Sequence, residues 1–281
     1  MVERGIACYI GRMTINIVIG LAALIALLPS ALLMIRGQAG RDDRLYWLLL
    51  AVAVAGQVAW AVVVFRDHWQ TGVAAALSVS VAAAVVLFAD VAAVSRQGWR
   101  LTPMVMIYLA LLGLLGLALQ GAAGQPLPGD TVDLWLGAHI GISVAAYGLL
   151  TLAAIAGLGV IVQERALKRR RPTGLSRLLP SVADGEALQT GLLAICEGVL
   201  LLGILTGIAI RYRATGDITD IDHKTLFSLL AFVVVGLLLA AHYRAGIRGR
   251  GAARWVLAAY LLLTLAYPGV KFVTDVLATA G

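Results

Sequence analysis

The sequence predicts an all-α fold, a polytopic membrane helix bundle with eight transmembrane helices and both termini outside. Three observations lead to this prediction. Hydrophobic residues make up 61% of the 281 residues and charged residues only 13%, whereas a soluble domain carries about 25% charged residues. The apolar residues lie in long continuous runs rather than in the alternating segments of a membrane β-barrel. Lys and Arg are divided unequally between alternate connections.

Each predicted span is an apolar run of about 20 residues or more, the length that crosses about 30 Å of hydrocarbon. Charged residues or a stretch rich in Gly and Pro bound the runs. In chain order the spans are 14–35 after Arg12, 46–65 between Arg44 and Arg66, 72–94 before Arg96, 102–121 after Arg100, 134–162 after Asp133, 188–210 before Arg211, 224–243 before Arg244 and 255–276 after Arg254. The connections are too short to form a soluble domain.

The spans divide the chain into two membrane halves, 14–121 and 134–276, preceded by an outside segment, 1–13. Met13 stands directly before the first span and is an alternative start, in which case residues 1–12 are not translated. The two cysteines, Cys8 and Cys196, form no CxxC or CxxCH motif. Covalent haem attachment and a zinc ribbon are therefore excluded.

The basic residues predict the orientation, because cytoplasmic loops carry an excess of Lys and Arg. Fifteen of the 22 lie on one side: Arg36, Arg41, Arg44, Arg96, Arg100, Arg165, Lys168, Arg169, Arg170, Arg171, Arg177, Arg244, Arg248, Arg250 and Arg254. The other seven are Arg4, Arg12, Arg66, Arg211, Arg213, Lys224 and Lys271. We expect the richer side to be cytoplasmic, with the run KRRR at 168–171 as a topology signal. Recognition of anionic membrane lipid or of a partner is the alternative for this run. The net charge of +7 does not predict nucleic-acid binding, because the spans leave no soluble face for a basic patch.

The histidines are the first candidate ligands. With this orientation His68, His139 and His223 lie on the outer side, and His242 lies at the cytoplasmic end of its span. His139 begins a polar series with Ser143, Tyr147 and Thr151, which we expect to face the bundle interior because a polar stripe is costly in lipid. His139 and His223 are matched in depth and would suit a bis-histidine haem iron. The alternative is that His139 bonds to a neighbouring helix and His223 caps its own.

Glu197 is a second candidate, because it lies near the middle of the span 188–210. A carboxyl group there predicts a proton relay or an ion site, and hence a small-solute transporter. The alternative is a hydrogen bond to Gln57, Tyr147 or Tyr260. Nucleophile, zinc-protease, P-loop and dinucleotide motifs do not occur in the sequence, so we expect that the protein is not an enzyme.

The second half resembles a known family. The segments LGAHIGISVAAYGLLTLAAIAGLGVIVQERALKRRR, LPSVADGEALQ…GVLLLGILTGI, HKTLFSLLAFVVVGLLLAAHYRAGIRGRGAARW and LTLAYPGVKFV, over roughly residues 130–276, are similar to the cytochrome c assembly (CcsA/CcmC-type) superfamily and to its YpjD/HemX-like branch. The resemblance implies a protein of the bacterial cytoplasmic (inner) membrane that binds haem non-covalently. It implies that His139 and Tyr147 match the outer-side histidine and tyrosine of one family span, and that His242 matches the histidine that ends a later span.

The chain departs from the haem-delivering members of that family in two places. The stretch 212–222 contains no Trp, where those members carry a tryptophan-rich loop, and no histidine follows the last span. We infer that His223 takes the place of the missing outer ligand. The leading hypothesis is a haem-handling protein related to cytochrome c biogenesis, with His139 and His223 on the iron. The alternative is a cofactor-free anchor or regulator of a haem-synthesis or cytochrome-assembly partner, docking through the loops 163–187 and 244–254.

Overall fold

The computed structural model describes residues 2–38, 40–65, 72–120, 134–216, 223–246, 249–265 and 269, with backbone only for 2–13, 65, 214, 215, 223 and 224. The regular elements in these ranges are all helical. They are α1 (Val2–Ile35), α2 (Arg44–Phe65), α3 (Val73–Val94), the 3-10 turn η1 (Gly98–Leu101), α4 (Thr102–Ala118), α5 (Leu134–Lys168), α6 (Gly174–Leu178), α7 (Val182–Thr215), α8 (His223–Ala245) and α9 (Gly249–Thr264). The predicted all-α fold is confirmed.

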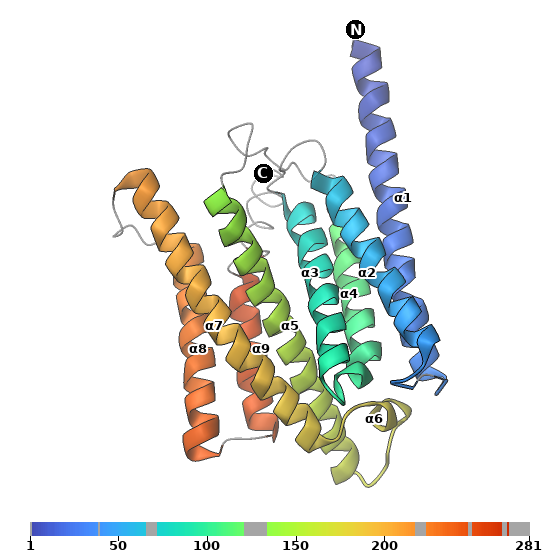
Figure 1. Cartoon of the computed structure of the whole chain (residues 1–281), viewed down its shortest axis with the longest axis vertical. Coiled ribbons are helices and arrows are strands. Elements are labelled where there is room, and N and C mark those ends of the chain that lie inside the picture. The colour runs from blue at the N-terminus through green and yellow to red at the C-terminus, as the bar shows by residue number, and fades with distance from the viewer. Residues whose placement is uncertain are drawn as a thin grey trace.

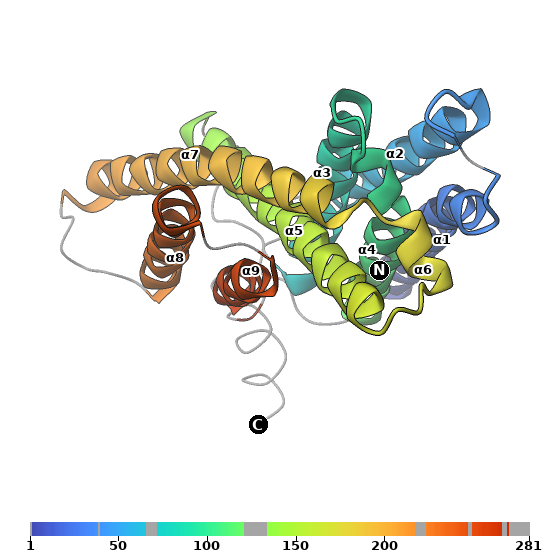
Figure 2. The ribbon, with the colours of Figure 1, turned by 90° about the horizontal axis from the view of Figure 1, so that it is seen from below.

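The long helices run up and down along one axis (Figure 1). Helices α1 to α4 form one group, in which α1 packs on α2 and α4, and α3 packs on α2 and α4. Helices α5, α7, α8 and α9 form the second group. Helix α5 lies between the groups and contacts α3 on one side and α7 and α9 on the other, as the view along the bundle shows (Figure 2). Two groups of four long helices therefore meet at α5.

Seven helices in the described ranges are long and apolar enough to span a membrane. They are Thr14–Ile35, Arg44–Val64, Val73–Val94, Gly98–Ala118, Leu134–Lys168, Val182–Arg213 and Thr225–Ala245. Helix α9 contributes 16 further residues, and most of the predicted eighth span beyond Leu265 lies outside the described residues. The basic connections α1–α2, α3–α4, α5–α7 and α8–α9 all lie at one end of the bundle, opposite the start of α1 and the end of α9 (Figure 1). The chain is a polytopic membrane bundle, and its helices alternate in direction as the predicted spans do.

Helix α1 begins at Val2 rather than at residue 14, and α5 and α7 also extend beyond the predicted spans. Helix α5 continues six residues past the expected end at 162, and α7 begins at Val182 rather than at 188 and ends at Thr215 rather than at 210. The added segments are polar but rich in good helix formers such as Ala, Leu, Glu and Lys. Hydropathy measures the part of a helix inside the hydrocarbon, so it misses the turns that extend beyond it. Ser181 begins α7 by accepting a hydrogen bond from the Asp184 amide, and Gly216, at φ +71°, ends it in the left-handed conformation.

Of the predicted loop 163–187, only 169–181 connects α5 to α7, and it is ordered by side chains rather than left as an open loop. It contains the short helix α6, which begins with a capping box between Thr173 and Ser176. The amide of Gln163 on α5 donates to the carbonyls of Ser176 (2.7 Å) and Pro180 (2.9 Å). The Arg100 guanidinium, from the first group, donates to the carbonyls of Leu178 (2.9 Å) and Arg177 (2.8 Å). This connection therefore joins both groups at the basic end of the bundle.

Helix α5 is the best buried of the spans. In its most apolar stretch 89% of the residues are buried, against 17% in α7 and in α8. Because α5 is enclosed by other helices, polar side chains on it face protein on more than one side. It is the helix that positions the candidate site residues.

Candidate functional site

His139 lies in the second turn of α5 and is half-buried against α7. Its Nδ1 atom is 2.9 Å from Oγ1 of Thr206. The Thr206 hydroxyl donates in turn to the carbonyls of Leu202 (2.9 Å) and Gly203 (3.0 Å) one turn earlier on α7. The tautomer that satisfies all of these contacts has Nδ1 of His139 donating to Thr206 while Thr206 donates to the carbonyls. In this tautomer Nε2 of His139 carries the free lone pair.

Small residues on α7 make room for this ring. Gly203 and Gly207 are spaced as in a GxxxG motif, which lets membrane helices approach closely. A Cβ atom at position 207 would lie 3.1 Å from Cε1 of His139, and one at 203 would lie 3.6 Å from Ile142. A side chain at 207 would displace the imidazole, so glycine is needed there for His139 to pack against α7.

An aromatic and a cationic side chain lie beside His139, nearer the end of the bundle at which α5 begins. The Cζ atom of Arg213 on α7 is 5.9 Å from the ring centre of Trp135, which lies one turn before His139 on α5. Both side chains are exposed. A cation–π contact of this kind is worth roughly 0.5–1 kcal/mol at an exposed site. This end of the α5–α7 pair thus carries an imidazole, an indole ring and a guanidinium in succession.

The other histidines are placed as follows. His223 begins α8, but its side chain lies outside the described residues, and so does all of His68. His242 is in the last turn of α8 at the basic end, where its ring meets that of Tyr243 edge to face at 5.3 Å. His242 and His139 therefore lie at opposite ends of the bundle. Among the described residues, His, Cys, Asp and Glu form no group of three that would hold a metal ion.

The polar series on α5 does not face one interior surface as expected. Ser143 is exposed, while Tyr147 and Thr151 are buried. Each step of four residues turns the direction of the side chain by about 40°, so His139 and Thr151 differ by about 120° around the helix. The series begins on the α7 side and ends on the α9 side. Helix α5 therefore presents His139 and Tyr147 to different neighbours.

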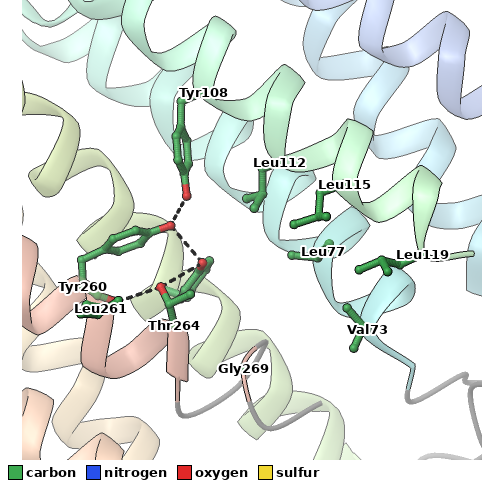
Figure 3. A pocket seen from close by; sticks show the side chains of 11 residues that line it. Val73, Leu77, Tyr108, Leu112, Leu115, Leu119, Tyr260, Leu261, Thr264 and Gly269 are labelled. Carbon is green, nitrogen blue, oxygen red and sulfur yellow. Dashed lines mark hydrogen bonds between the residues drawn. The ribbon is translucent and has the colours of Figure 1, made fainter. Parts of the chain in front are cut away.

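Tyr147 belongs to a chain of hydroxyl groups that joins three helices (Figure 3). Its hydroxyl is 3.0 Å from that of Tyr260 and 3.4 Å from Oγ1 of Thr264, both on α9. The Tyr260 hydroxyl is also hydrogen-bonded to that of Tyr108 on α4. Thr151 donates to the Tyr147 carbonyl (2.7 Å) within α5. This network links the two helix groups.

Glu197 faces α8 near the middle of α7. Its Oε1 lies 2.7 Å from where a Cβ of Gly236 would be, and its Oε2 is buried with no hydrogen-bond partner in the described structure. The alternative considered for it, a hydrogen bond to Gln57, Tyr147 or Tyr260, does not occur among the described residues. Gln57 lies on α2 and donates to the Ala23 carbonyl (2.8 Å) instead. Spans matched in depth need not be neighbours, and the closely packed neighbours of α7 are α5 and α8.

Several residues around His139 and in the hydroxyl network of Tyr147 were not predicted from the sequence: Trp135, Thr206, Gly207, Arg213 and Tyr108. Two signals were available in the sequence. The segment GILTG at 203–207 combines the small-residue spacing of a helix contact with a hydroxyl group beside it. Tyr108 places a polar group inside an apolar span, as His139 does.

Comparison with known proteins agrees with the resemblance in the sequence. The family model described as cytochrome C assembly protein matches residues 44–278. A 28.8 kDa protein in the nifR3-like 5′ region of Azospirillum brasilense is 48% identical over 270 residues, 94% of this chain and 99% of that protein. No solved structure matches the chain.

Two further relatives have names that match the expected branch. Protein HemX of Brevibacillus brevis is 31% identical over 133 residues, 47% of this chain and 48% of that protein. Inner membrane protein YpjD of Escherichia coli K12 is 28% identical over 189 residues, 65% of this chain and 67% of that protein. The family match runs from the start of α2 beyond the end of α9 and so covers most of both helix groups. The chain belongs to the cytochrome c assembly protein family and resembles its YpjD-like members.

Proposed function

We propose that this protein handles haem on the outer side of a bacterial inner membrane, with Nε2 of His139 as one axial ligand of the iron. The observation that carries the proposal is the hydrogen bond from Nδ1 of His139 to Thr206. Metal-binding histidines commonly donate their second ring nitrogen in this way, which holds the ring and raises the basicity of the ligand. Membership of the family establishes only the class of protein. The proposal adds to it a ligand, haem, and a residue that binds the iron.

The residues around His139 suit a haem group. Haem supplies a redox-active iron and two propionates, and its ring needs apolar and aromatic surroundings. Trp135 offers an aromatic face and Arg213 a guanidinium on the outer side of His139, where a propionate would find its counter-ion. His223 is our candidate for the second axial ligand, because it begins α8 at the same end of the bundle. His242 would belong to a separate site at the cytoplasmic end. The protein acts here as a binding protein and not as an enzyme.

The test is the absorption spectrum of the detergent-purified protein titrated with hemin. We expect a Soret band that shifts on binding and is lost in His139→Ala. Thr206→Val removes the acceptor of the Nδ1 proton without touching the iron, so it should weaken hemin binding about 10- to 100-fold. Ser143→Ala, which alters an exposed polar residue one turn further along α5, serves as the control. A wild-type protein that binds no hemin, or an unchanged band in His139→Ala, would overturn the proposal.

A second candidate function is that of a membrane anchor or regulator for a haem-synthesis or cytochrome-assembly protein. The ordered connection 163–187 favours it, since Gln163 and Arg100 hold α6 in place beside the exposed run 168–171. A structured basic surface loses less conformational entropy on docking than a loose loop does. Co-purification of a partner that survives loss of the four histidines, but not neutralisation of 168–171, would favour this function over haem binding.

A further inference from the structure

The carboxyl group of Glu197 lies inside a membrane span and has no part in haem binding at His139. Glu197 is half-buried on α7, 9 residues into the apolar run that begins at 188. At 1.5 Å per residue this is about 14 Å of helix, close to half of the roughly 30 Å of hydrocarbon that a span crosses. An ionisable group at this depth is costly and is by default a candidate functional site.

The helices around Glu197 bring no counter-charge to its depth. The closely packed neighbours of α7 are α5 and α8. The nearest acidic, basic or imidazole side chains on these three helices are Glu186 and Arg211 on α7, Lys224 and His242 on α8, and His139 and Glu164 on α5. Glu186 and Arg211 are 11 and 14 residues from Glu197. These intervals correspond to about 16 and 21 Å of helix. His242 is in the last turn of α8, at the basic end of the bundle.

Two weaker acids on the same helices are bonded elsewhere. The Cys196 thiol, next to Glu197 in the sequence, donates to the Ala146 carbonyl on α5 (3.5 Å). The Tyr147 hydroxyl is 3.0 Å from that of Tyr260 on α9. The carboxyl group of Glu197 is therefore the acid of this region that is left to bind or release a proton.

The packing around Glu197 suits a neutral carboxyl group and not a carboxylate. A Cβ atom at Gly236 on α8 would lie 2.7 Å from Oε1, so the glycine makes room for the carboxyl group. Oε2 is buried and has no hydrogen-bond partner in the described structure. A carboxylate without a counter-charge or a donor is far more costly in an apolar environment than the neutral acid, so such a group takes up a proton. The carboxyl group of Glu197 therefore carries a proton in this packing.

The cation that fits this site is a proton and not a metal ion. Metal ions such as Ca²⁺ and Mg²⁺ are held by about six or more oxygen ligands. Among the described residues, His, Cys, Asp and Glu form no group of three around Glu197 or elsewhere. A proton needs only one carboxyl oxygen, which Glu197 supplies by itself.

We propose that Glu197 is a proton-binding site within the bilayer, which stays protonated at neutral pH and releases its proton when water reaches it between α7 and α8. This narrows the ion site expected from the sequence to a site for a proton. Helices α7 and α8 suit such a site because only 17% of the most apolar stretch of each is buried by the rest of the protein. Their contact at Gly236 therefore lies close to lipid, and a membrane-soluble reagent can reach the carboxyl group.

The first experiment labels the full-length protein in phosphatidylcholine vesicles with the hydrophobic reagent dicyclohexylcarbodiimide. A protonated carboxyl group adds across one C=N bond of this reagent: its oxygen bonds to the central carbon and its proton goes to a nitrogen. The product keeps all atoms of both molecules, and mass spectrometry of the peptides locates it. The reaction is run at about pH 7, where an ordinary glutamate is ionised.

We expect Glu197 to be labelled by dicyclohexylcarbodiimide. The water-soluble, cationic ethyl(dimethylaminopropyl)carbodiimide should label it at least about tenfold less, since a charged reagent is costly to bring into hydrocarbon. Failure of the hydrophobic reagent to label Glu197, or equal labelling by both reagents, would overturn the proposal.

Three variants assign the label to this carboxyl group. Glu197→Gln should abolish labelling of the peptide that contains residue 197. Asp90→Asn is the matched control, because it removes an exposed carboxyl group from another span, four residues before the end of α3, and it should leave the label at Glu197 unchanged. Cys196→Ala should also keep the label, which excludes the neighbouring thiol as the reacting group. A label that persists in Glu197→Gln, or is lost in Cys196→Ala, would show that the assignment is wrong.

The second experiment measures release of the proton through the pH dependence of unfolding. Unfolding exposes the side chain to water, where an ordinary glutamate is ionised above about pH 5. The folded protein then binds one proton more than the unfolded protein, so a rise of pH favours unfolding. Between about pH 6 and pH 8 the unfolding equilibrium constant of the wild type, relative to that of Glu197→Gln, should rise by up to about tenfold per pH unit. Equal pH dependence of the two proteins would overturn the proposal. None of these outcomes depends on hemin binding at His139.

Discussion

The hydrogen bonds of Tyr260 lead to a prediction about stability. The Tyr260 hydroxyl is hydrogen-bonded to those of Tyr147 and Tyr108, so Tyr260→Phe breaks two bonds between helices. A hydrogen bond between membrane helices contributes about 0.6 kcal/mol on average. The substitution also takes this partner from the part-buried Tyr108 hydroxyl, at a cost of about 1–3 kcal/mol. Together these give a loss of about 2–4 kcal/mol.

Tyr108→Phe is the matched comparison, because it removes the first hydroxyl of the same chain. Only one of the two bonds of Tyr260 is lost, and Tyr260 keeps its bond to Tyr147, so the expected cost is about 0.6–1 kcal/mol. In the Tyr260→Phe background the same substitution removes a hydroxyl that has already lost this partner. Tyr108→Phe is therefore expected to be destabilising in the wild type and neutral or stabilising in Tyr260→Phe.

Equilibrium unfolding in mixed micelles with increasing SDS fraction measures all four proteins of this cycle. The free energies of unfolding give the coupling between the two hydroxyls directly. Additive effects of the two substitutions would refute a direct hydrogen bond between these two hydroxyls. A cost of Tyr108→Phe equal to or above that of Tyr260→Phe would refute the two-bond role of Tyr260.

Three further predictions concern helix contacts. Gly207→Val should lower the free energy of unfolding by about 1–3 kcal/mol, because the new side chain overpacks against His139. Gly198→Ala is the control, since a Cβ there meets nothing within 4 Å, and it should be neutral or stabilising in the same SDS unfolding assay. Equal effects of the two would show that the contact with His139 is not tight. Gln163→Ala should speed trypsin cleavage in the connection 169–181 about tenfold, because the carbonyls of Ser176 and Pro180 lose the donor that holds α6 in place. An unchanged cleavage rate would contradict this role of Gln163. Glu197→Met should raise the free energy of unfolding by about 1 kcal/mol, since Oε2 is buried without a hydrogen-bond partner in the described structure. A free energy of unfolding below that of the wild type would mean that the carboxyl group makes a stabilising contact.

Much of the fold could be predicted from the sequence because the bilayer acts on each helix separately. A span must be apolar over about 20 residues whatever it packs against, so the seven spans seen in the described residues match predicted runs. The alternation of basic loops can likewise be predicted, because the charge of each loop acts on the orientation independently of how the helices pack. The predicted eighth span and His223 as a ligand remain predictions, because the residues concerned lie largely outside the described ranges.

The site could be predicted only in part, because it depends on which helices are neighbours. His139 was chosen from the sequence, but its partner Thr206 is 67 residues away on α7. Tyr147 was placed beside His139 in one polar series, and the drift of that series around α5 separates them onto different sides. Tyr260 was considered as a partner for Glu197, yet it bonds to Tyr147 and Tyr108 instead.

The sequence by itself determined that this protein is a helical membrane bundle, how its spans alternate and which family it resembles, since these depend on hydropathy, loop charge and linear motifs. The tertiary structure decided the partner of His139 and the hydrogen bonds among Tyr108, Tyr147 and Tyr260. These depend on contacts between helices far apart in the sequence. All the spans are similarly apolar, so lipid does not favour one pairing of helices over another. Small residues and a few hydrogen bonds select the pairing, and they do so only once the helices are packed.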